Sequence, residues 1–321
     1  MHVKAKEYAF MLKYILKRIV MIIPVMLAVS LIVFCMMDLV PTDPAITVLG
    51  DQATEADLEA YREAHGLNDP LLVRYVRYMA GALKGDLGTS YATGKPVWEL
   101  YFAKFPYSLK LALMSMAIAT LLALPLGIIA AVKEGSFIDN LCSITTFVGV
   151  AMPSFWFALI LMLLFAVKLQ WLPATGANHG IVSLIMPSLA VGIINCATVA
   201  RTTRSAMLDA MSSDYLRTAR SKGVAETDVI TNHALKNASI PIVTMIGTSL
   251  TAMLGGSIVI ERVFAWPGTG SFLIDSVQKN DYPVVTGFLI LLSFFVSISL
   301  LIVDLIYAFL DPRIKAQYTN K

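Results

Sequence analysis

The stretch VVTGFLILLSFFVSISLLIV, Val284–Val303, decides the class of this protein because it contains no Asp, Glu, Lys or Arg. An α-helix of about 20 such residues spans the roughly 30 Å hydrocarbon core of a bilayer. Five other stretches are similarly long and equally free of charge: Ile19–Met37, Leu111–Val132, Leu141–Val167, Ile181–Ala200 and Ile240–Ile260. We therefore predict an all-α integral membrane protein with six transmembrane helices.

The composition of the whole chain agrees with this class. Of its 321 residues, 57% are hydrophobic and only 15% are charged, and the mean hydropathy is +0.71. A soluble chain carries about 25% charged residues, so a disordered protein, a nucleic-acid binder and a typical cytosolic enzyme are excluded. Cys35, Cys142 and Cys196 lie in apolar runs without metal-ligand spacing. We interpret them as small buried hydrophobes and predict no disulfide and no metal site.

The Lys and Arg residues predict the orientation of the chain. With the N-terminus inside, the inner side collects fifteen of them and the outer side ten. Seven of those ten lie between Arg62 and Lys110, in or just after one long loop, where the positive-inside rule has little weight. We expect both termini to be cytoplasmic. The predicted segments are a cytoplasmic N-terminus at 1–18, a first span at 19–37, an extracytoplasmic loop at 38–106, a five-helix core at 107–310 containing an inner loop at 201–238, and a cytoplasmic tail at 311–321.

The first span is too long for a signal peptide, and no A-x-A-like cleavage site follows it. We therefore expect it to remain attached as a signal anchor. The outer loop contains two amphipathic patterns, near Glu55–His65 and Leu71–Leu83. These helices would lie on the membrane surface or cap the spans from outside.

The inner loop has the pattern helix, glycine, helix. Asp214–Lys222 is predicted to be a short helix, and Gly223 follows where a left-handed residue ends a helix most easily. Thr227 is predicted to cap a second helix, Asp228–Ala238. A short helix held beneath a membrane bundle is suited to contact with a soluble partner. The alternative interpretation is a solvated basic loop that only sets the topology.

Motifs for several chemistries are missing from the sequence. It has no GxxxxGK[ST] phosphate loop, no HExxH and no GxSxG, and the six spans contain no carboxylate pair. We predict no catalytic residue and no cofactor bound by this chain. Asp304, directly after the sixth span, is interpreted as an interfacial carboxylate. These observations leave a membrane pathway without an energy source of its own.

The inner loop resembles a known family. The segment DYLRTARSKG, Asp214–Gly223, continued by HALKNA, His233–Ala238, and by Pro241, is similar to the E-A-A-x-x-x-G loop of permease subunits of ATP-binding-cassette (ABC) importers. Against the general pattern, Arg217 replaces Glu, and His233 and Lys236 replace Ile and Pro. These departures are typical of the dipeptide, oligopeptide, glutathione and nickel branch, and of the first of its two paired permeases.

Other stretches resemble the same family, in order and over nearly the whole chain. These stretches are PTDPA at 41–45, GDLGTS at 85–90, PSFW at 153–156, WLP at 171–173, WPG at 266–268, DYP at 281–283 and DPRI at 311–314. In PTDPA, Thr42 replaces the Gly that is usual in the family.

The resemblance implies the type I ABC importer permease fold in a bacterial or archaeal cytoplasmic membrane. It implies four kinds of partner: a second permease, two ABC ATPases that hold ATP and Mg, an extracytoplasmic binding protein and membrane lipids. It also implies that the inner loop docks on an ATPase and switches the pathway between inward-facing and outward-facing states. The residues expected at this docking surface are Tyr215, Arg217, Thr218, Ala219, Arg220, Lys222, Gly223, His233, Leu235 and Asn237.

The sequence indicates the residues that line the transport pathway less clearly than those of the docking surface. Asn195 and Thr198 are the most polar pair in the fourth span, and Thr248 and Thr251 add hydroxyls in the fifth. These four residues are the candidates for lining the pathway. Gly247, Thr251 and Gly255 form a stripe of small residues that favours close helix packing. The packing partner is either the second permease or another span of this chain.

Three functions remain open at this stage. The first is a permease subunit for ATP-driven uptake of short peptides. The second is the same machinery importing nickel, a metallophore or glutathione. The third, from another class, is a self-sufficient channel or ion-coupled transporter, and a membrane-embedded enzyme is more remote.

Overall fold

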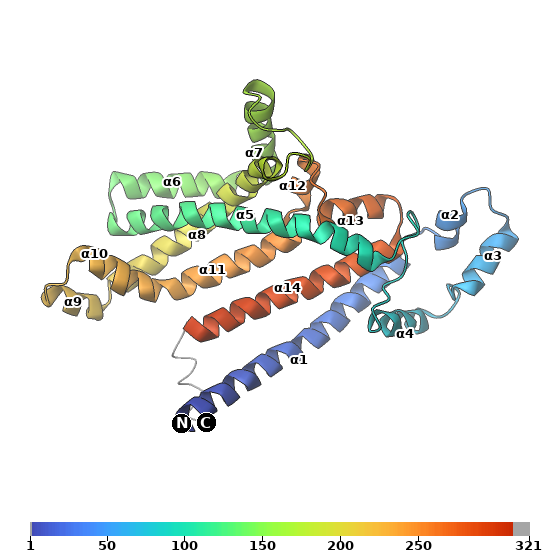
Figure 1. Ribbon diagram of the computed structural model, residues 1–321, viewed down its shortest axis with the longest axis horizontal. Coiled ribbons are helices and arrows are strands. Elements are labelled where there is room, and N and C mark those ends of the chain that lie inside the picture. Colours follow the sequence, from blue (N-terminus) through green and yellow to red (C-terminus); the bar gives the residue numbers. More distant parts are fainter. Residues whose placement is uncertain (1, 311–321) are drawn as a thin grey trace. The chain divides into compact units, whose positions relative to one another are not determined.

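The computed structural model describes residues 2–310, and the side chains of residues 15–149 and 151–307. Residues 2–310 contain no β-strand, only an isolated antiparallel bridge between Thr89 and Pro96. The predicted tail at 311–321 lies outside the described residues. The helices, labelled in Figure 1 where there is room, are α1 (His2–Asp38), α2 (Pro44–Leu49), α3 (Glu55–Ala64), α4 (Leu71–Ala82), α5 (Val97–Val132), α6 (Phe137–Ala151), α7 (Ser154–Leu161), η1 (Met162–Lys168), α8 (Ile181–Met211), α9 (Asp214–Ser221), α10 (Glu226–Asp228), η2 (Val229–Ala234), α11 (Leu235–Gly256), α12 (Ile258–Val263), α13 (Thr269–Gln278) and α14 (Tyr282–Leu310).

The all-α prediction is confirmed, and the described residues contain five candidate spans, or six if one broken helix counts as a span. The five described runs that are long and apolar enough to cross a membrane are Ile15–Asp38, Val97–Val132, Ile181–Met211, Glu226–Gly256 and Tyr282–Tyr307. The sixth candidate is the pair formed by α6 with α7 and η1.

The predicted third span, Leu141–Val167, is broken in the middle. The helical segments before and after the break are bent by 100° relative to each other. Met152 has an extended backbone, with φ −83° and ψ 123°. Pro153 explains this conformation, because a proline lacks the N–H for a helical bond and disfavours helical geometry in the preceding residue.

Three helix ends differ from the predicted span ends. Helix α5 begins at Val97, before the core boundary predicted at 107, and α8 continues past Ala200 to Met211. The fifth span ends at Gly256 instead of Ile260, and α12 then starts anew. Hydropathy marks only the part of a helix that lies in hydrocarbon, whereas backbone hydrogen bonding continues into polar sequence.

The two amphipathic helices predicted in the outer loop are confirmed as α3 and α4. Thr54 and Asp57 form a capping box at the start of α3. Sequence reasoning missed α2, although its signal was present. Asp43 accepts a hydrogen bond from the Ala45 amide at 2.8 Å, and Pro44 occupies the first helical position.

The chain divides into two compact units, and α1, α5 and α14 contribute to both. Unit 1 contains Leu109–Trp266 together with the described residues of 2–15 and 298–310. Helix α8 is its centre, since α6, α7, α11 and α12 all contact it. A small residue also lets α5 approach α8 closely: a Cβ at Gly192 would lie 2.8 Å from the Ser115 carbonyl oxygen on α5.

Unit 2 contains Leu16–Ser108 and Pro267–Ser297. Its core is aromatic: the ring of buried Tyr101 lies edge-on to Phe288, with 5.0 Å between the ring centroids. Val97 packs on α14 at Gly287, where a Cβ would lie 2.6 Å from a Val97 methyl carbon. The Ser108 hydroxyl accepts a hydrogen bond from the Thr269 amide at 2.8 Å and so holds the start of α13.

Gly247 provides a test of the packing between α11 and α14. A Cβ at this position would lie 2.5 Å from a Val303 methyl carbon, and a valine side chain is too stiff to rotate away freely. We expect Gly247→Ala to lower the free energy of unfolding by about 1–3 kcal/mol, the usual cost of overpacking. Thermal unfolding of the purified protein in mild detergent measures it.

Gly256→Ala is the matched control, because a Cβ there meets no atom within 4 Å. Adding Val303→Ala to Gly247→Ala should restore much of the lost stability. Equal unfolding temperatures for Gly247→Ala and Gly256→Ala would show that the contact does not limit packing.

Candidate functional site

Within unit 1, helix α9 of the inner loop is held by one buried side chain. Leu216 of α9 is fully buried and packs in a cluster with Met207 of α8 and Val229 of η2. Helix α9 begins after Ser213, whose backbone is extended. The predicted helix Asp214–Lys222 is thus confirmed with one residue fewer, and one of its faces is fixed.

The remaining surface of α9 is polar and exposed. Arg217 has 81% of its side-chain surface exposed, and Tyr215 and Lys222 are exposed as well. Thr218 donates a hydrogen bond to the Asp214 carbonyl at 3.1 Å and is also exposed. Ala219 is half-buried and packs against the cluster around Leu216. The helix therefore presents a basic surface on an apolar base.

Gly223 forms the predicted left-handed turn, with φ +79°. The Gly223 amide donates to the Arg220 carbonyl at 3.0 Å, and the Val224 amide donates to the Ala219 carbonyl at 3.3 Å. The Arg220 guanidinium also bonds the Glu226 carboxylate across the turn at 2.7 Å, and this raises the pKa of Arg220. An exposed ion pair adds little stability, so the backbone bonds define the turn.

The second half of the loop differs in one respect from prediction. Helix α10 begins at Glu226 after an extended Ala225, so Thr227 lies within the helix and does not cap it. An extended residue before Glu226 starts the helix without a side-chain cap. Farther along, His233 and Asn237 are exposed, and the Asn237 amide donates to the His233 carbonyl at 3.2 Å. Leu235 packs against the apolar cluster of the loop.

The polar residues of the fourth span have separate environments. The Asn195 amide donates to the Val191 carbonyl at 2.9 Å within α8. Asn195 also lines a cavity of about 190 Å³ in unit 1, with Ser154 of α7 and Ser257 after α11. Thr198, one turn farther along α8, is half-buried. Asn195 is thus the only one of the four pathway candidates on the wall of this cavity.

The two threonines of the fifth span face different surroundings. Thr248 is exposed, and its hydroxyl donates to the carbonyl of Thr244 at 3.0 Å. Thr251 is buried and hydrogen-bonds Ser299 of α14 at 2.8 Å. With the close approach of Gly247 to Val303, this contact makes α14 of the same chain a packing partner of the small-residue stripe. Gly255 is half-buried.

An ion pair at the start of α6 was not found from the sequence. Asp139 is buried, and both of its carboxylate oxygens accept from Arg204 of α8, at 2.6 and 2.7 Å. The Gly135 amide donates to the same carboxylate at 3.0 Å. This bidentate pair ties α6 to the half of α8 that leads into the inner loop.

Three of the quoted motifs meet in unit 2. Asp281, only 2% exposed, accepts from the Ser90 hydroxyl at 2.5 Å and from the Tyr91 amide at 3.0 Å. Burial raises the pKa of Tyr91 to about 12. The neighbouring Tyr282 hydroxyl donates to the Thr42 carbonyl at 2.9 Å. The motifs at 41–45, 85–90 and 281–283 therefore form one junction.

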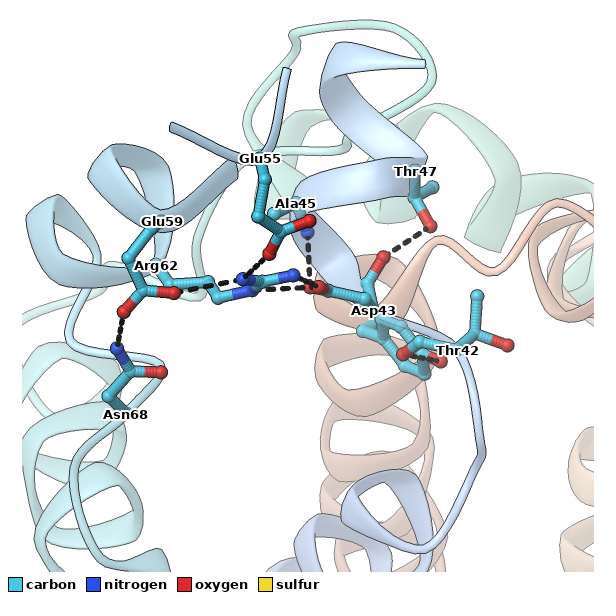
Figure 2. A network of polar contacts seen from close by, with 9 residues as sticks. Thr42, Asp43, Ala45, Thr47, Glu55, Glu59, Arg62 and Asn68 are labelled. Carbon is cyan, nitrogen blue, oxygen red and sulfur yellow. Dashed lines mark hydrogen bonds and ion pairs between the residues drawn. The ribbon is translucent and has the colours of Figure 1, made fainter. Parts of the chain in front are cut away.

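Figure 2 shows a second network in the outer loop, centred on Arg62 of α3. Its guanidinium bonds the carboxylates of Asp43 at 2.6 Å, Glu55 at 2.8 Å and Glu59 at 2.9 Å. The hydrogen bond from Arg62, with a second from Asn68, lowers the pKa of Glu59. Arg62 thereby joins α3 to the residue that caps α2.

Two family models match the chain. Residues 123–316 match the model described as binding-protein-dependent transport system inner membrane component, and residues 11–112 match its N-terminal companion. The chain is 38% identical over 315 residues to the oligopeptide transport system permease protein AppB of Bacillus subtilis, covering 95% of this chain and 100% of that protein. It is 42% identical over 305 residues to the glutathione transport system permease protein GsiC of Salmonella paratyphi A, covering 95% and 99%.

Solved structures of low sequence identity share the fold. An inward-facing structure of the MetNI methionine ABC transporter matches with a TM-score of 0.56 at 17% identity, over 66% of this chain and 96% of that one. An amino acid ABC transporter with histidines matches with a TM-score of 0.51 at 18% identity, over 65% and 93%.

The junction at Asp281 can be tested by removing its carboxylate. We expect Asp281→Ala to leave the Ser90 hydroxyl and the Tyr91 amide without their acceptor, at a cost of about 1–3 kcal/mol. The loop between Gly88 and Val97 should then open, and limited chymotrypsin digestion should cleave after Tyr91 about tenfold faster or more. Asp51→Ala, which removes an exposed carboxylate of the same loop region, is the control. Unchanged cleavage in Asp281→Ala would contradict this role.

Proposed function

The chain belongs to the family of binding-protein-dependent transport system inner membrane components, and from that premise we propose that it serves the ATP-driven uptake of short peptides. It is a multi-pass permease subunit of an ABC importer and is not an enzyme in itself. The pathway would form between this chain and a second permease. Permeases of this family work in general with a paired permease, with ATPases and with a binding protein.

The observation that carries the coupling proposal is the construction of α9. One side of this helix is anchored by buried Leu216, and the other side is polar and exposed. A rigid helix of this kind can transmit a displacement from a partner to α8 and α11. The docking surface would consist of Tyr215, Arg217, Thr218, Ala219, Arg220, Lys222 and Gly223, continued by His233, Leu235 and Asn237.

We propose that ATP and Mg bind in the partner ATPases and not in this chain. Closure of the ATPases on nucleotide would draw α9 with them and favour one state of the pathway over the other. The free energy for this switch comes from the difference in docking contacts between the two states. In this arrangement both termini and the inner loop are cytoplasmic.

The substrate assignment rests on relatives. AppB of Bacillus subtilis is named for oligopeptides and DppB of Alkalihalophilus pseudofirmus for dipeptides, both at 38% identity. Glutathione is the second candidate, because the relative GsiC is 42% identical. The pathway residues would include Asn195 and Thr198, with Thr248 and Thr251 on the fifth span, and the cavity beside Asn195 supports its place among them.

Purification and reconstitution test this function together. The chain should be purified in mild detergent from its native membrane, and its partners identified by mass spectrometry. We expect a second permease, two P-loop ATPases and, after reconstitution with the binding protein, ATP-dependent uptake of labelled dipeptides and tripeptides. Uptake of glutathione alone would select the second candidate. Transport by the isolated chain without ATPases would contradict the proposal.

Gly223 provides the test of coupling. We expect Gly223→Asp to add a charge at the docking turn and a side chain in a left-handed conformation, lowering ATP-dependent uptake about tenfold or more. ATP hydrolysis by the complex should continue without stimulation by substrate. Both rates are measured in proteoliposomes.

Gly85→Asp is the matched control, since Gly85 also has a positive φ, +86°, open space around its Cβ position and the same pair of backbone hydrogen bonds across its turn. It lies in the outer loop after α4, outside the proposed docking surface. Equal uptake by the two variants would exclude a specific role for the Gly223 turn.

A further inference from the structure

Helix α4 has an apolar face that no described residue covers. Leu72 is 67% exposed, Val76 64% and Leu83, directly after the helix, 86%. These residues are spaced by four and seven positions, so they form one stripe along the helix. Val73, also exposed, borders this stripe. Large apolar side chains gathered in this way indicate a contact surface.

An adjoining face of α4 packs against α1 within unit 2. The rings of Tyr75 and Tyr78 lie beside Phe34, with centroids 5.6 and 5.8 Å away. The Tyr75 hydroxyl hydrogen-bonds the Ser30 hydroxyl at 2.8 Å and donates to the Leu27 carbonyl at 3.3 Å. Helix α4 is therefore attached to the side of α1 and not to its end.

The position of these contacts along α1 gives the depth of α4. The charge-free stretch Ile19–Met37 is about 28 Å long at 1.5 Å per residue, which matches the hydrocarbon core. Asp38, the first charged residue after it, marks the outer edge of that core. Ser30 lies about 12 Å farther inward by the same rise per residue. The Tyr75 hydroxyl thus reaches α1 at a level inside the hydrocarbon layer.

The charges of α4 agree with this depth. Arg74 bonds Asp38 at 2.6 Å, and its guanidinium lies 5.8 Å from the centroid of the Phe34 ring. Arg77 bonds Asp69 at 2.5 Å. Both arginines occupy the edge of the helix away from Leu72 and Val76, as in helices that lie in the interface of a membrane.

We propose that α4 lies in the outer leaflet of the membrane, with Leu72, Val76 and Leu83 against lipid acyl chains and its arginine edge at the level of the headgroups. The stripe has the same apolar character as the surface of α1, where Ile32 and Met36 are exposed. Lipid is the occupant that fits, because α4 is attached to the flank of α1, whose charge-free stretch is long enough to cross the hydrocarbon core. This placement is independent of the transported substrate.

Site-directed spin labelling tests this placement in the complete importer reconstituted in lipid. Single cysteines replace Leu72 and Val76 in a background in which Cys35, Cys142 and Cys196 are changed to serine. Glu63→Cys on α3, an exposed position of the same loop, is the matched control. We expect collisions with oxygen, which partitions into lipid, to exceed those with a water-soluble nickel chelate at positions 72 and 76, and the reverse at position 63.

Two results would overturn the proposal. Frequent collisions with the nickel chelate at position 76 would place the face in water, and few collisions with either reagent would mean that a protein covers it. If the cysteine-free background does not assemble, benzoylphenylalanine at position 72 of the otherwise natural chain replaces the label. Crosslinking in membranes should then add the mass of a phospholipid, whereas a protein adduct would refute the assignment.

Discussion

Hydrocarbon offers no hydrogen-bonding partner to a peptide, so the backbone polar groups of a span must find theirs within the protein. Helices satisfy the backbone, and the hydroxyl groups here largely use their own helix: Thr248 donates to the Thr244 carbonyl and Ser293 to the Leu289 carbonyl. Burial of apolar surface does not drive helices together in lipid, so contact requires close fit. Gly247 against Val303 and Gly192 against α5 supply this fit.

The same constraint moves the charged groups to the ends of the helices, where they fasten one segment to another. Asp139 and Arg204 join α6 to α8, and Arg74 and Asp38 join α4 to α1. The half of α8 that holds Arg204 leads directly into the inner loop. Helix α9 therefore starts from a part of unit 1 that is fastened by a partly buried ion pair and packed around Leu216. In the coupling that we propose, this attachment would let α9 transmit a displacement of the ATPase to α8.

Sequence patterns predicted those helices and turns that are determined by residues close together along the chain. The two outer-loop helices, the short helix α9 and the left-handed Gly223 follow from apolar spacing and from the conformational freedom of glycine. Hydropathy placed the third span at Leu141–Val167, but an apolar run does not specify that the chain bends by 100° at Pro153. Thr227 was assigned as a cap on residue type alone, yet Ala225 supplies the extended residue that starts the helix.

The sequence by itself determined that this chain crosses a membrane, roughly where it does so, and to which family of permeases it is related. These properties depend on hydropathy and on residues that are close along the chain. Only the tertiary structure decided which residues separated in sequence would meet: Asp281 with Ser90, Asp139 with Arg204, and Tyr75 with Ser30. Such pairs depend on how helices cross and how closely they approach, and no periodicity within a single segment contains that information.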